Sequence, residues 1–250
     1  MISYYYKHKR SANTCEDLLT SITFDGLKHL PTEIFWKILK LSLIHDKLPH
    51  VSGELENISY WESWDAKGTS NSKKVYPDVF LRFYNFDVIV EAKRYDEKQQ
   101  YSEQKIREII SYFNEYRDDN KQLYFIQLGG LHNFDDEQDF LFENKNVIIC
   151  KTNWTKLLHQ IVVQKEIFQK QNLSLFNSYL RILDDIILGF ELHNFYQVKW
   201  LKDLKTQRII SARFQFNSNY KGSSIKRKFK NIKSYNINST TTNTLFSYAK

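Results

Sequence analysis

Two carboxylates and a lysine lie close together in the segment YPDVFLRFYNFDVIVEAKRY, residues 76–95. Asp78 precedes Glu91 by thirteen positions, and Lys93 follows Glu91 by two. Carboxylate oxygens are ligands that Mg²⁺ prefers, commonly together with the phosphate oxygens of a substrate. A lysine beside them could hold an attacking water or stabilise the charge that develops on a phosphate. These residue types therefore predict a metal site for phosphate chemistry.

A β-hairpin would bring the three side chains to one face. With the turn centred on residues 84–85, Asp78 faces Glu91 across the two strands, and Lys93 projects from the same face. Because side chains alternate along a strand, the other face is wholly apolar. That face carries Val79, Leu81, Phe83, Phe86, Val88, Val90 and Ala92. It must pack against a helix, and a slip of one residue would mix the two faces.

The predicted pairing of Asp78 with Glu91 requires a positive partner. Like charges directly opposite each other are destabilising, because their Cβ atoms lie about 4.5–5.5 Å apart. Within the hairpin, only Lys93 could relieve them, and a divalent cation would do so more fully. The alternative is a solvent-facing strand pair with scattered charges, which fits poorly with a sheet whose faces are covered by helices.

The remaining pattern predicts an α/β fold, an α+β mixed sheet with helices on its faces. Helices are expected over 11–30, 31–44, 98–117, 153–168 and 175–190. Strands are expected near 58–65, 76–83, 86–93, 122–128 and 146–150. Acidic residues gather over 135–143, where a solvated face or a helix start is expected instead of a metal cluster.

The motif Pro77-Asp78, followed by Glu91-Ala92-Lys93, resembles that of the PD-(D/E)XK nuclease superfamily, which has the restriction-endonuclease-like fold. The family core is a helix, three antiparallel strands, a helix and a further strand, or αβββαβ. The first half of this chain can be laid on that order. The resemblance therefore implies a nuclease core flanked by helices.

Two further positions agree with the family. Many members carry a glutamate on the first helix, and Glu16 is its counterpart here. Members often carry a glutamine near the start of the helix after the motif, and Gln104 matches it, with Gln99 and Gln100 as alternatives. The resemblance thus adds Glu16 and Gln104 to the predicted catalytic set.

The resemblance implies Mg²⁺-dependent hydrolysis of DNA phosphodiesters, with Mn²⁺ as a substitute ion. Asp78 and Glu91 would bind the metal, with the backbone carbonyl of Ala92 as a third ligand. Glu16 would act on the metal directly or through water. Lys93 would orient the nucleophilic water and stabilise the transition state. The metal would lower the pKa of that water and neutralise phosphate charge.

The implied protein is an endonuclease of a prokaryotic restriction or antiphage defence system. One alternative is a nuclease-fold assembly or binding subunit of a defence complex that cuts little or nothing. Another is a DNA repair or junction-resolving nuclease, and RNA stays open as a substrate. Cutting both strands of a duplex needs two active sites, so we expect a homodimer or a subunit of a larger complex.

The positive charge of the chain is concentrated at its C-terminal end. The net charge is +7, yet residues 199–250 hold twelve Lys or Arg and one acid. We therefore expect a nuclease-like domain over 1–195, with its core at about 12–150 and a helical extension over 153–190, and a basic extension over 196–250. Phosphate contacts are expected from Lys226, Arg227, Lys228, Lys230 and Lys233. The alternative is a solubilising tail.

Other candidate residues carry weaker signals. The seven histidines lack metal-binding spacing, and two cysteines cannot make a zinc site. His132 follows a predicted strand end and could approach the site. Trp61 and Trp64 precede the hairpin and are the best candidates for stacking on bases, although tryptophan more often lies in a core. The few cysteines and the lack of a membrane-length apolar run predict a cytoplasmic protein without membrane contact.

Overall fold

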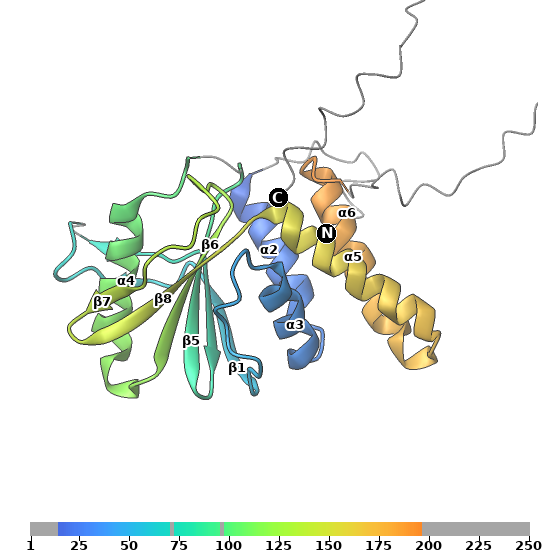
Figure 1. The fold of residues 1–250 in the computed structure, drawn as a ribbon, viewed down its shortest axis with the longest axis horizontal. Coiled ribbons are helices and arrows are strands. Elements are labelled where there is room, and N and C mark those ends of the chain that lie inside the picture. Colours follow the sequence, from blue (N-terminus) through green and yellow to red (C-terminus); the bar gives the residue numbers. More distant parts are fainter. Residues whose placement is uncertain (1–14, 71–72, 96–97, 197–250) are drawn as a thin grey trace, which may run out of the picture. The chain divides into compact units, whose positions relative to one another are not determined.

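The computed structural model describes residues 15–70, 73–95 and 98–196. They form a mixed α/β fold, in which helices flank a six-stranded mixed sheet of order β1-β4-β5-β6-β8-β7 (Figure 1). Its strands are β1 (Leu55–Tyr60), β4 (Val79–Phe83), β5 (Phe86–Ala92), β6 (Gln122–Leu128), β7 (Phe140–Phe142) and β8 (Lys145–Thr152). A separate pair contains β2 (Trp64–Asp65) and β3 (Lys74–Val75). The predicted fold class is therefore confirmed.

Five α-helices are present in the described residues. They are α2 (Glu16–Leu27), α3 (Thr32–Ser42), α4 (Ser102–Tyr116), α5 (Trp154–Gln171) and α6 (Asn177–Leu192), with short 3₁₀ turns η1 (Arg117–Asp119) and η2 (Ser174–Phe176). All five predicted helices are found, with boundaries shifted by a few residues. No helix in the described ranges has the length and apolar character needed to cross a membrane.

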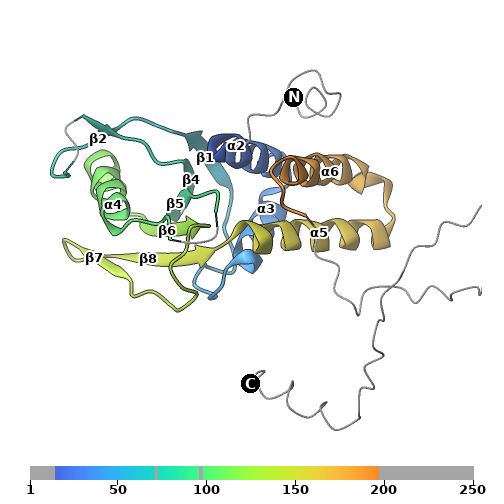
Figure 2. The same ribbon diagram turned by 90° about the horizontal axis from the view of Figure 1, so that it is seen from above.

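The hairpin β4–β5 has the predicted register. Val79 pairs with Val90, and Arg82 pairs with Asp87. The apolar face is fully buried in a core shared with α2, α3, α5 and α6, which lie together on one side of the sheet (Figure 2). Alternation along the strands thus produces the packed face that the sequence predicts.

Helix α4 covers the opposite face of the sheet (Figure 2). Its residues Ile109, Tyr112 and Phe113 pack in a second core. This core also contains Phe80 and Ile89, which lie between the charged residues of the hairpin. Both faces of the sheet are covered, so the charged side chains near the end of the hairpin are largely shielded from solvent.

The strand that was expected over 58–65 is interrupted. Strand β1 ends at Tyr60, and the short strand β2 belongs to the other sheet. Between them, Trp61 has a left-handed backbone with φ of 47°. A non-glycine residue is uncommon in this region of the φ/ψ map, so the chain turns here where the run of strand-forming side chains predicts continuity.

The acidic stretch 135–143 does not start a helix, which corrects one of the two expectations for it. Residues 135–139 form a loop and residues 140–142 form β7, and Asp136 and Glu137 of the loop pair with lysines from other elements. Residues 197–250 of the predicted basic extension lie outside the described residues. The predicted phosphate contacts Lys226, Arg227, Lys228, Lys230 and Lys233 lie there with them.

Three parallel strands end at one edge of the sheet. Strand β5 pairs with β6, and β6 pairs with β8, in both cases in parallel. Glu91, Gln127 and Lys151 are register partners and form a row near the carboxyl ends of these strands. In open α/β sheets, ligands bind outside this end of the strands.

Candidate active site

The five side chains predicted to form the site converge at the end of strand β5. Asp78 directly precedes β4, Glu91 is the second-to-last residue of β5, and Lys93 follows that strand. Glu16 is the first residue of α2, and Gln104 lies in the first turn of α4. The fold therefore gathers residues that are up to 88 positions apart in the chain.

Asp78 is held by two donors. The backbone N–H of Ala92 donates to its Oδ2 at 2.9 Å, and the indole Nε1 of Trp61 donates to its Oδ1 at 3.1 Å. The residue is only 9% exposed. Burial, and then the neighbouring carboxylate of Glu91, raise the pKa of Asp78 to about 8. The two carboxylates therefore lie close enough to repel each other, as the register predicts.

Glu91 accepts from two side chains of the predicted set. The amide Nε2 of Gln104 donates to its Oε1 at 2.5 Å, and the ammonium of Lys93 forms an ion pair with the same oxygen. Lys93 also lies 3.5 Å from Oε1 of Glu16. Burial disfavours the Lys93 ammonium, but the charges of Glu91, Asp78 and Glu16 outweigh it and raise its pKa above the ordinary value. Lys93 is therefore a permanent cation at neutral pH.

Glu16 joins helix α2 to the end of the hairpin. Its Oε2 accepts a 2.7 Å hydrogen bond from the backbone N–H of Arg94. The other carboxylate oxygen faces Lys93, so one glutamate contacts both the backbone and the side chain that follow β5. Glu16 thus lies beside Lys93 at the end of the hairpin, and its action on a metal stays a prediction.

Two glycines make room for Lys93 at the end of β6. Gly129 has φ of +74°, and a Cβ there would lie 2.2 Å from the backbone oxygen of Lys93. A Cβ on Gly130 would lie 2.6 Å from the Cβ of Lys93. The Lys93 oxygen also accepts a 2.8 Å hydrogen bond from Nε1 of Trp154. The chain can therefore approach Lys93 this closely only with glycine at both positions.

Glu108 is a site residue that the sequence analysis missed. It is 1% exposed on α4, one turn after Gln104, and its carboxyl lies against Glu91. Oε2 of Glu91 and Oε2 of Glu108 have no hydrogen-bond partner within the described residues. Burial, and then the charge of Glu91, raise the pKa of Glu108 well above its ordinary value, which favours its neutral form. A glutamate beside Ile109 on the apolar face of the helix was the available signal.

The remaining candidates occupy different places. Trp64 is 1% exposed in the second core, so it cannot stack on a base, whereas Trp61 is 37% exposed beside Asp78. His132 Nε2 bonds to the backbone oxygen of Gln100 at 2.8 Å. The amide of Gln100 in turn donates to the backbone oxygen of Glu91 at 3.1 Å. His132 is therefore linked to the site through Gln100.

The donor set suits a small hard cation in its ligand type. In residues 15–70, 73–95 and 98–196, no group of three or more His, Cys, Asp or Glu side chains is arranged to hold a metal ion. Mg²⁺ needs fewer protein ligands, because it commonly binds through one or two carboxylates and keeps several waters. Asp78 and Glu91 supply two adjacent carboxylates, and burial, followed by the charge of Glu91, raises the pKa of Asp78 although the Lys93 ammonium lies nearby. A divalent cation between the two carboxylates would stabilise both of them in their ionised form.

No protein-family model matches the chain. A search of curated proteins finds a similar chain in Pasteurella multocida (strain Pm70), named "Uncharacterized protein PM0110". It is 31% identical over 234 residues, which are 90% of this chain and 86% of the relative. The match extends over nearly the whole of both chains.

Proposed function

We propose a function for the family to which this chain and the Pasteurella multocida protein belong: metal-dependent hydrolysis of phosphodiester bonds in DNA. The observation that carries the proposal is the convergence of Asp78, Glu91 and Lys93 at the end of β5. Each element that brings these residues together is required for the core packing, so their meeting follows from the fold. The proposal also draws on the resemblance of the motif to PD-(D/E)XK nucleases.

Asp78 and Glu91 would hold a Mg²⁺ ion, with Mn²⁺ as a substitute. The ion would lower the pKa of a bound water and neutralise charge on the phosphate. The carboxylates are oriented before any ligand arrives, because Asp78 accepts from Ala92 and Trp61, and Glu91 accepts from Gln104. Ligands fixed in this way need little reorganisation when a cation binds.

Lys93 would act through its charge. Its pKa is raised, so it cannot accept a proton from water near neutral pH. The ammonium can orient an attacking water and stabilise the negative charge that grows on the phosphate oxygens. Glu16, 3.5 Å away, helps to fix its position. In this proposal the carboxylates bind the metal cation, and Lys93 stabilises the negative charge that develops on the phosphate.

The proposal is tested by incubating the purified chain with supercoiled DNA, linear DNA and RNA, in Mg²⁺ and in EDTA. The Asp78→Ala and Lys93→Ala proteins are measured beside it. Asp184→Ala and Lys165→Ala are matched controls, because these residues form an ion pair between α6 and α5. Cleavage should need Mg²⁺, survive in both controls and be lost in both site variants.

The outcomes separate the alternatives. Cleavage that persists in Asp78→Ala and Lys93→Ala contradicts the site. Binding of DNA without cleavage under any condition would favour an assembly subunit. Cutting of supercoiled DNA supports an endonuclease, which is the activity that we infer for a restriction or antiphage role.

A further inference from the structure

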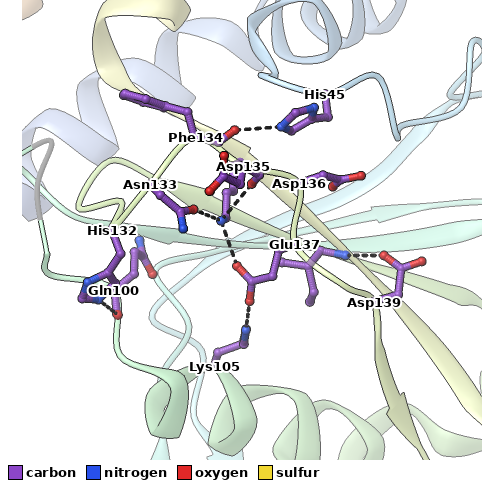
Figure 3. A network of polar contacts seen from close by, with 12 residues as sticks. His45, Gln100, Lys105, His132, Asn133, Phe134, Asp135, Asp136, Glu137 and Asp139 are labelled. Atoms are coloured by element: carbon purple, nitrogen blue, oxygen red, sulfur yellow. Dashed lines mark hydrogen bonds and ion pairs between the residues drawn. The ribbon is translucent and has the colours of Figure 1, made fainter.

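A polar cavity of about 280 Å³ opens beside the candidate active site. It lies between the start of α4, the carboxyl ends of β6 and β8 and the loop that carries the acidic residues (Figure 3). Its lining includes Ser102, Lys105, Gln127, His132, Glu137 and Lys151. None of these six residues belongs to the predicted catalytic set, so the cavity is a feature that the motif does not explain.

The cavity is one strand away from the catalytic carboxylates. Gln127 on β6 is the register partner of Glu91 on β5, and Lys151 on β8 is the register partner of Gln127. Neighbouring strands lie about 4.8 Å apart. A ligand in the cavity would therefore lie within one or two nucleotides of a phosphate at Asp78 and Glu91.

Two lysines in the cavity share one carboxylate. Lys105 forms an ion pair with Oε1 of Glu137 (Figure 3). The Nζ of Lys151 lies 3.3 Å from Oε2 of the same side chain. The three groups come from α4, the acidic loop and β8. Glu137 thus places two oxygens of an anion between two ammonium groups, which is the arrangement that a phosphate would require.

Gln127 adds a hydrogen-bonding side chain to the wall of the cavity. The residue is 5% exposed and lines the cavity. Its side-chain amide faces the open cavity, where it can bond to water or to a ligand. Its NH₂ group is available to donate to an oxygen in the cavity.

The chemistry of the lining favours a phosphate over a base. His132 is the only ring among the described residues that line the cavity, so no stacking platform for a base is formed. The N-terminal end of α4, at Ser102, carries partial positive charge that also favours an anion. Two ammonium groups, an amide and a helix N-terminus suit the oxygens of a phosphate once Glu137 is displaced. Asp136, which also lines the cavity, is paired with Lys47.

We propose that this cavity binds a second, non-scissile phosphate of the nucleic-acid substrate. Lys105 and Lys151 neutralise its charge and Gln127 donates to it. Glu137 pairs with the two lysines in the free protein and is displaced when the phosphate enters. This inference rests on the proposed nuclease function, and it adds a second site at which the substrate strand is bound. The phosphate is either a terminal 5′-phosphate or an internal one.

The first test measures binding of inorganic phosphate by calorimetry in EDTA. Glu137→Gln keeps the size of the side chain and removes the competing charge, so it should bind phosphate about tenfold more tightly than the native chain. Lys105→Ala should bind at least about tenfold more weakly. Lys165→Ala removes a partly buried lysine from α5 and should bind like the native chain. Equal affinities in all four proteins would overturn the proposal and leave Glu137 a purely structural partner.

A second test identifies the source of the phosphate. Short duplexes with 5′-phosphate or 5′-hydroxyl ends are bound in EDTA over a range of salt concentrations. For a terminal phosphate, the 5′-phosphorylated duplex binds more tightly, and Lys105→Ala abolishes the difference. For an internal phosphate, both duplexes bind alike, and Lys105→Ala lowers the salt slope by about one for each. An unchanged slope with no preference for either end contradicts both forms.

The two proposals fail in different ways. If Asp78→Ala abolishes cleavage while the Lys105 and Glu137 variants bind phosphate and cut DNA like the native chain, the cavity proposal is wrong and the nuclease proposal stands. If no protein cuts nucleic acid but phosphate binding changes as expected, the cavity is a phosphate site and the nuclease proposal is wrong.

Discussion

The backbone N–H of Ala92 donates a 2.9 Å hydrogen bond to Oδ2 of Asp78, so the end of strand β5 itself fixes the carboxylate that precedes β4. This bond holds Asp78 beside Glu91 although the two carboxylates repel each other. The repulsion adds to burial and raises the pKa of Asp78 to about 8. The free protein therefore keeps a proton at a position where the proposed function requires a cation.

The affinity for a divalent cation should depend on pH through Asp78. A cation binds the ionised carboxylate, so below pH 8 it must displace a proton. We expect the dissociation constant for Mn²⁺ or Mg²⁺ to fall about tenfold per pH unit from pH 6 to pH 8 and to level off above that. Calorimetric titration at several pH values measures it.

Asp78→Asn is the control for this dependence. The asparagine cannot ionise, so metal binding should be weaker by at least about tenfold and nearly independent of pH over the same range. Metal affinity of the native chain that does not change between pH 6 and pH 8 would show that Asp78 is not a ligand.

Replacing Lys93 with methionine should separate metal binding from cleavage. Lys93 forms an ion pair with Glu91 and so competes with a cation for that carboxylate. Lys93→Met should bind Mn²⁺ at least as tightly as the native chain, while its cleavage rate falls by roughly 100-fold or more, because the charge that stabilises the transition state is lost. Calorimetry and single-turnover cleavage measure the two effects. Parallel losses of binding and cleavage would assign Lys93 a structural role.

The hairpin was predictable because two independent patterns agree on its register. Alternation places seven apolar residues on one face, and any slip would bury charge, so the pairing of residues 79–82 with 87–90 follows from the sequence. Glu16 and Gln104 were found by resemblance alone, since no local pattern connects their helices to the hairpin.

The missed features depend on contacts between distant segments. In the sequence, Glu108 is only a charged residue that interrupts the apolar face of an amphipathic helix. Its place beside Glu91 depends on the fold. The turn at Trp61 has no glycine or proline to mark it, and its left-handed backbone interrupts a strand of favourable composition. The cavity at Lys105 and Lys151 combines a helix, a strand and a loop, and no spacing in the sequence relates the three.

Glu108→Gln should stabilise the metal-free protein in a pH-dependent way. The pKa of Glu108 is higher in the folded than in the unfolded protein. The protonated glutamate therefore contributes its full stabilisation of the folded protein only below the unfolded pKa, and this contribution is lost as pH rises towards the folded pKa. Each pH unit between the unfolded and the folded pKa of Glu108 costs about 1.4 kcal/mol for one proton. We therefore compare the free energy of unfolding of Glu108→Gln with that of the native chain at two pH values. The difference between the two proteins should be larger at pH 8 than at pH 5 by at least about 1 kcal/mol.

Urea unfolding in EDTA at both pH values measures this difference. Glu103→Gln is the matched control, since Glu103 is exposed on the same helix and should show no such pH dependence. A Glu108→Gln curve that runs parallel to the native one between pH 5 and pH 8 would mean that Glu108 is ionised in the folded chain.

Gly129→Ala should damage the site without touching any predicted catalytic side chain. Its new Cβ would lie 2.2 Å from the backbone oxygen of Lys93, so the chain at the end of β5 must move. Gly53→Ala is a matched control, because Gly53 has a similar φ of +69° and nothing within 4 Å of the added atom. Gly53→Ala should cost only about 1–2 kcal/mol for the left-handed backbone. Gly129→Ala should cost clearly more in urea unfolding, and at concentrations where both proteins are folded it alone should lower the cleavage rate. Equal stability and equal cleavage in the two variants would show that the close approach of Gly129 does not position Lys93.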